Sequence, residues 1–143
     1  MAYTAFLPKP GRLGIAPTAF QSGSLNLGTL AAGTQTHNMG AFPNKAYVDS
    51  IVVCAGTFPT ASTSCTIQIS TFDGTNTVNL TAATDINAKT AGAPIALSLL
   101  STLTEAQRTL STIESLQVSV VTVGTVSVQP VDLTVTVQLS VEN

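Results

Sequence analysis

The sequence contains very little charge. Only 8% of its 143 residues are Asp, Glu, Lys or Arg, against roughly 25% in an average soluble domain. The five basic residues are spread along the chain, so they form no concentrated basic patch that could neutralise nucleic-acid phosphates. Hydrophobic residues make up 44%, whereas disordered chains combine low hydrophobicity with high charge. We therefore expect one folded domain that does not bind nucleic acid.

Long apolar runs are also missing. The longest unbroken run covers residues 51–55, and a membrane-spanning helix needs about 20 such residues. The first ten residues have neither a basic start nor an apolar segment with a cleavage site, so they do not resemble a signal peptide. We expect a protein that neither enters a membrane nor follows the secretory route.

The residues that catalysis and metal binding require are scarce. His37 is the single histidine, the seven acidic residues do not cluster in the sequence, and no nucleophile elbow or phosphate-binding glycine motif is present. The run Asp73-Gly74-Thr75-Asn76 could offer oxygen ligands to calcium, but the same residues are ordinary hairpin-turn chemistry. We therefore expect no enzyme activity, no cofactor and no bound metal.

The chain has two cysteines, Cys54 and Cys65, too few for a disulfide scaffold. A hairpin could bring them together, and the alternative is two small buried thiols. We expect them to lie on neighbouring strands and to be reduced, as in a protein assembled in the cytoplasm.

What the sequence does contain is alternation of apolar and polar residues. Between residues 131 and 141 every odd-numbered residue is Val or Leu and every even-numbered residue is polar, which predicts a strand with its odd-numbered side chains buried. Residues 65–72 and 115–123 repeat the pattern. In the latter, Val121 and Val123 also make the second face apolar, so this strand is expected to be central or covered by a neighbouring subunit.

Turn residues separate these runs. Asp73-Gly74 predicts a hairpin between 65–72 and 77–80, and Gly124-Thr125 links 115–123 to a short strand at 126–129. Further strands are expected near 24–30, 35–42, 48–54 and 94–100, a loop at 81–93, and a helical turn at 102–108 that Thr102 and Glu105 cap. The predicted fold is all-β: an antiparallel β-sandwich, jelly-roll-like, with about eight strands.

Residues 1–20 differ from the rest and are expected to form an extended N-terminal arm, with the sandwich over residues 21–143. Three prolines disfavour helix and sheet there, yet the segment carries large apolar groups that a solvated tail would not need. It is therefore expected to pack on its own sandwich or on another chain. The candidate contact residues are Phe6, Leu7, Lys9, Arg12, Leu13, Ile15 and Phe20.

The C-terminal part resembles a known kind of protein. The residues concerned are 103–110 (LTEAQRTL), 129–133 (QPVDL) and the alternating valines that follow, together with 78–81 (VNLT). They resemble small β proteins encoded near capsid genes in tailed bacteriophages, the head decoration (cement) proteins. The resemblance covers about half of the chain. It implies a structural protein that binds the outer surface of an assembled capsid and stabilises the lattice.

The resemblance also implies partners and a location. The partners would be the major capsid protein and further copies of the chain, with a trimer favoured, and the location would be the capsid surface after assembly in the host cytoplasm. The alternative is a binding module, such as a head-fibre base or a carbohydrate-binding sandwich. That alternative predicts exposed aromatic side chains or an acidic calcium cluster.

Overall fold

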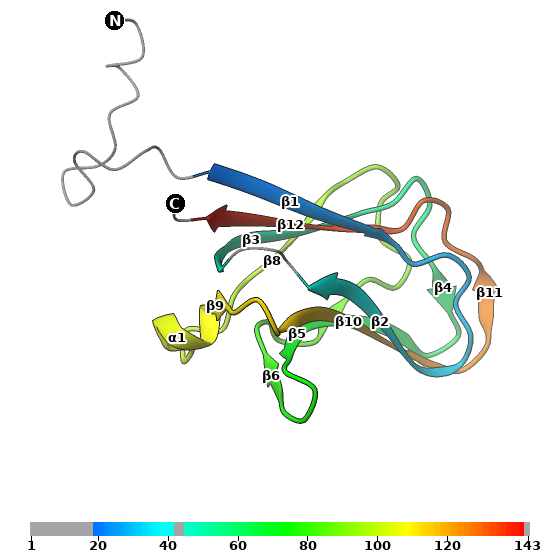
Figure 1. The fold of residues 1–143 in the computed structure, drawn as a ribbon. Helices are drawn as coiled ribbons and strands as arrows, with labels where there is room; N and C mark the ends of the chain where they lie inside the picture. Colours follow the sequence, from blue (N-terminus) through cyan, green and yellow to red (C-terminus); the bar gives the residue numbers. More distant parts are fainter. Residues whose placement is uncertain (1–18, 42–44, 142–143) are drawn as a thin grey trace, which may run out of the picture.

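The computed structural model describes residues 19–41 and 45–141, which form two antiparallel sheets packed face to face (Figure 1). The first sheet has the order β1 (Ala19–Asn26), β12 (Thr134–Val141), β3 (Ala46–Cys54) and β8 (Ile95–Leu97), with β9 (Thr109–Leu110) also paired to β3. The second has the order β2 (Gly33–Ala41), β10 (Ser115–Val123), β5 (Ser64–Phe72) and β6 (Thr77–Asn79), with β7 (Thr84–Asp85) also paired to β5. A small sheet of β4 (Thr60–Ala61) and β11 (Val126–Val128) lies at one end of the sandwich.

This arrangement confirms the predicted antiparallel β-sandwich. Each main sheet has four strand positions, since β8 and β9 share one side of β3 and β6 and β7 share one side of β5. The first strand lies beside the last and the second beside the tenth, which is the winding of a jelly roll. The sequence did not predict β4, β7 and β9, because a two-residue strand is too short to show an alternating pattern.

The alternation in β12 is confirmed from Leu133 to Leu139. Leu133, Val135, Val137 and Leu139 are at most 1% exposed and lie in the core between the sheets. The expectation was wrong for Val131, which is 54% exposed. Asp132 has a φ of +52°, so the chain turns there and the strand begins only at Thr134. Val131 lies before that turn, in an isolated bridge with Thr57.

Strand β10 is central in its sheet, as its two apolar faces predicted. It pairs with β2 on one side and β5 on the other, and Leu116, Val118 and Val120 are buried. Val121 and Val123 lie on the outer face and are 37% and 47% exposed. The predicted hairpin also forms, because β5 and β6 pair across the turn at Asp73 and Gly74.

The helical turn is shorter than expected and has a different cap. Helix α1 covers Glu105–Arg108, and its capping box is Thr104 with Gln107 rather than Thr102 with Glu105. The Thr104 hydroxyl accepts from the Gln107 N–H at 3.2 Å, and the Gln107 side chain accepts from the Thr104 N–H at 2.9 Å. Glutamine serves in the capping box as well as glutamate does, so the pattern fitted two positions.

Candidate functional site

The structure describes one of the seven candidate contact residues. Phe20 lies in β1, where its backbone is opposite Ser140 of β12. The other six, Phe6, Leu7, Lys9, Arg12, Leu13 and Ile15, lie outside the described residues. Strand β1 begins at Ala19, so the last two residues of the expected arm belong to this strand.

The cysteines are on different sheets, and the expectation of neighbouring strands was wrong. Cys54 ends β3 in the first sheet and is exposed, whereas Cys65 lies in β5 of the second sheet and is buried. The intervening residues cross from one sheet to the other instead of turning back as a hairpin. Both thiols are free, and burial raises the pKa of the Cys65 thiol.

Residues 19–41 and 45–141 contain no cluster that could hold a metal ion. In this part of the chain, no three His, Cys, Asp or Glu side chains come close enough to hold a metal ion. None of its helices is long and apolar enough to cross a membrane. His37 lies half-buried in β2, opposite Val118 of β10.

The turn that could have bound calcium uses its carboxylate internally. The Asp73 carboxylate accepts hydrogen bonds from the backbone N–H groups of Asn76 at 2.6 Å and Thr75 at 2.8 Å, and from the Asn76 side chain at 3.2 Å. These bonds, those from Asn76 first, hold the pKa of Asp73 below its ordinary value of 3.8. The Asp73 side chain therefore closes the hairpin turn.

This turn should weaken in acid. Because the pKa of Asp73 is lowered in the folded chain, its contribution to stability is complete above 3.8 and is lost as the pH falls through the lowered value. Titration of the Asp73 carboxyl carbon by NMR should give a midpoint below 3.8. A midpoint at or above that value would contradict the observed hydrogen bonds.

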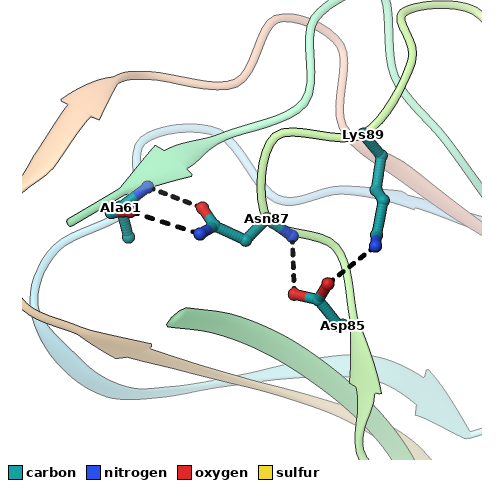
Figure 2. Close-up of polar contacts among 4 residues, drawn as sticks. All are labelled: Ala61, Asp85, Asn87 and Lys89. Atoms are coloured by element: carbon teal, nitrogen blue, oxygen red, sulfur yellow. Dashed lines mark hydrogen bonds and ion pairs between the residues drawn. The ribbon is translucent and has the colours of Figure 1, made fainter. Parts of the chain in front are cut away.

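The loop after β7 is fastened to the small sheet by a polar cluster, shown in Figure 2. The Asn87 side chain accepts from the Ala61 N–H at 2.7 Å and donates to the Ala61 carbonyl at 3.2 Å, as a neighbouring strand would. Asp85 accepts from the Asn87 N–H at 3.0 Å and pairs with the Lys89 ammonium at 2.7 Å. The hydrogen-bonded Lys89, and then the Asn87 N–H, lower the pKa of Asp85. The cluster therefore holds the loop after β7 against β4.

Replacing Asn87 by alanine should destabilise the domain by about 1–3 kcal/mol, because both backbone groups of the buried Ala61 lose their partner. The matched control is Asn79→Ala, which truncates an exposed asparagine on β6. Chemical denaturation of the two variants measures the difference. Equal midpoints would show that the Asn87 bonds contribute nothing to stability.

The residues that carry the phage resemblance have structural roles. The Gln129 side chain bonds both backbone groups of Leu30, each at 2.9 Å. The buried Thr81 hydroxyl accepts from the Ile69 N–H at 3.0 Å. The Arg108 guanidinium stacks on the Tyr47 ring, 4.6 Å from its centroid, and donates to the Val48 carbonyl at 3.2 Å. These three residues therefore connect separate parts of the fold.

On the outer face of the second sheet, the described strands β2, β10 and β5 direct no charged side chain outward. We call these outward residues the hydroxyl face: Thr34, Thr36, Asn38, Ser64, Thr66, Gln68, Gln117, Ser119, Val121 and Val123. Ser70 lies on the same side of β5 but is only 5% exposed. Its exposed members offer uncharged hydrogen-bonding groups, and Val121 and Val123 add apolar area. The sequence indicated such a face, because the polar residues of each alternating run point away from the core.

Comparison with known proteins gives a structural likeness. No family model matches the sequence, and no curated protein matches it. The fold is similar to that of a chain in the capsid of Ralstonia phage GP4, with a TM-score of 0.54 and 15% identity, over 96% of this chain and 90% of that chain. The likeness in fold therefore extends over nearly the full length of both chains.

A weaker likeness is to a chain of infectious bursal disease virus, Gx strain. It has a TM-score of 0.45 and 13% identity and covers 87% of this chain. The chain spans about a third of that protein, 32%.

Proposed function

We propose that this protein is a structural component of a tailed-phage virion that binds the outer surface of the capsid and stabilises the lattice. The observation that carries the proposal is the likeness to a component of the Ralstonia phage GP4 capsid over nearly the full length of both chains. The sequence resemblance to decoration proteins agrees with it. A decoration protein needs no active site.

The surfaces suited to capsid contact are the hydroxyl face and the arm. The hydroxyl face offers hydrogen-bonding groups without charge, together with Val121 and Val123. In the arm, the apolar Phe6 and Leu7 would bury area on the shell, and Lys9 and Arg12 would meet an acidic capsid surface. The partner is then the major capsid protein, and further copies of the chain complete a symmetric oligomer, with a trimer favoured.

The binding-module alternative has less support. A carbohydrate platform needs exposed aromatic rings. Among the aromatic residues whose side chains the structure describes, Phe58 is 2% exposed and Tyr47 and Phe72 are half-buried. The Tyr47 ring is also covered by Arg108. A calcium-dependent module needs an acidic cluster, and the described residues form none.

The test is binding to phage capsids that lack the protein. We expect the purified chain to sediment with such capsids, to saturate at a stoichiometry of many copies per shell, and to raise the temperature at which the shells break. Saturation at the few vertex positions would indicate a fibre base instead. A chain that stays in the supernatant at every concentration would refute the proposed function.

A further inference from the structure

One side of the sandwich has two long edge strands. Strands β1 and β2, of 8 and 9 residues, each stand at the end of their sheet and contact each other (Figure 1). In an antiparallel ladder, alternate residues of an edge strand direct their N–H and C=O groups away from the sheet. Along the outer side of β2 no other described strand pairs with these groups.

The opposite side of the sandwich is protected in a way that β2 is not. Its edges are β8 and β6, of three residues each, and β9 and β7, of two, and very short strands are a common defence against edge pairing. Other defences are lysine, inward charges and proline, and β2 has no charged residue and no proline. Its one register shift lies beyond Asn38, which leaves Gly33–Asn38 regular.

The core is also incompletely closed along this side. The inward side chains of β2, Gln35, His37 and Met39, are half-buried, and Leu25 of β1 is only partly buried against the core. The buried Nε2 atom of His37 has no hydrogen-bond partner. A further strand beside β2 would cover these groups and pair its free backbone.

The chain contains a segment that fits this position. Residues 11–16 (GRLGIA) lie between Pro10 and Pro17 and contain no proline themselves. In an extended conformation, this segment places Leu13 and Ile15 on one face and Arg12 on the other, because side chains alternate along a strand. The apolar face would lie over the open core, and the six residues match the regular length of β2.

We propose that residues 11–16 of a second copy add to the free edge of β2 as an extra strand of the second sheet. Pairing within the same chain is disfavoured. A two-residue hairpin back onto β1 would need a positive φ at Pro17, which the ring forbids. To reach β2, residues 16–19 could stretch about 10 Å. Packed sheets are in general about 10 Å apart, and the position beside β2 lies one strand spacing further out.

Such an exchange is head-to-tail and can close into a ring, which agrees with a trimer. It goes beyond the proposed function, because it concerns contact between copies and needs no capsid. Residues 1–10 would stay available for the shell.

The decisive experiment is disulfide trapping in a Cys54→Ser background without capsids. A chain carrying Leu13→Cys is mixed under oxidation with a chain of different mass carrying His37→Cys. We expect a cross-linked pair of the two masses. The matched control is Thr36→Cys, whose side chain lies on the outer face, and it should cross-link at least tenfold less.

Sedimentation velocity supplies the second readout. The Leu13→Asp/Ile15→Asp double variant should remain folded by circular dichroism and sediment as the 14.6 kDa monomer, whereas Thr4→Asp/Ala5→Asp should keep the oligomer. A chain carrying both cysteines that forms an internal disulfide, with no cross-link in the mixture, would overturn exchange between copies. Absence of any cross-link, or an unchanged oligomer in the double variant, would overturn the pairing itself. Capsid binding measured separately would leave the proposed function intact in either case.

Discussion

Replacing Val135 by aspartate should abolish folding of the domain. Val135 is fully buried in β12, between Leu25 of β1 and Val53 of β3 in the register of the first sheet. A carboxylate there would lose its hydration without gaining a cation, at a cost of several kcal/mol. Since the whole stability of a domain is about 5–15 kcal/mol, most or all of it would be lost. Circular dichroism and thermal denaturation should show no cooperative transition.

Thr136→Asp is the matched control. It introduces the same charge one residue further along β12, on the exposed face. This variant should keep a cooperative transition close to that of the parent chain. A Val135→Asp protein that melts at the parent temperature would contradict the register of β12, because a shift by one residue exchanges the two faces.

Gly124→Ala should also be strongly destabilising. Gly124 links β10 to β11 with a φ of +86°, a conformation that costs other residues about 1–2 kcal/mol. A Cβ atom there would lie 2.1 Å from the Ser62 hydroxyl oxygen and 3.3 Å from the Thr63 backbone nitrogen. Ser62 would have to move, and its 3.0 Å hydrogen bond from the Thr125 N–H would break. We expect a total loss of about 3 kcal/mol or more.

Gly92→Ala separates the two causes. Gly92 has a similar φ of +72°, but a Cβ atom there meets nothing within 4 Å. Its substitution should therefore cost only the conformational part. Urea denaturation of both variants measures the difference. If the two variants have the same urea midpoint, the contact between the new Cβ atom and Ser62 does not contribute to the loss of stability.

The sequence predicted the parts of the fold that depend on periodic burial. The runs at 65–72 and 115–123 became β5 and β10 almost to the residue, because a strand with one face in the core must alternate. Val131 shows the limit of that argument, since a positive φ at Asp132 ended the strand and no apolar pattern reports a backbone turn. Cys54 and Cys65 show another, because the sequence does not say whether a ten-residue connection returns to its own sheet or crosses to the other.

The candidate contact surface was less predictable. The apolar groups and the basic pair of residues 1–20 indicated a contact segment without showing its partner, and Phe20 lies in β1. The hydroxyl face follows from the same alternation that predicts the strands, but its extent depends on which strands lie side by side. Strands β2 and β10 are more than seventy residues apart in the chain, and the pairing of Val121 with Thr34 has no local signal.

The pairing of the first strand with the last determines how the domain responds to force. Ala19 is opposite Val141, so β1 begins and β12 ends at the same end of the sandwich (Figure 1). Tension applied through the two ends would load the β1–β12 ladder one hydrogen bond at a time, as in opening a zipper, and the domain should yield at low force. Tension between a handle near β11 and either end would instead run along the strands and load many bonds together. If a capsid shell were attached to the arm and to the opposite end of the sandwich, the force on the domain would act along the strands. The domain resists force best in that direction.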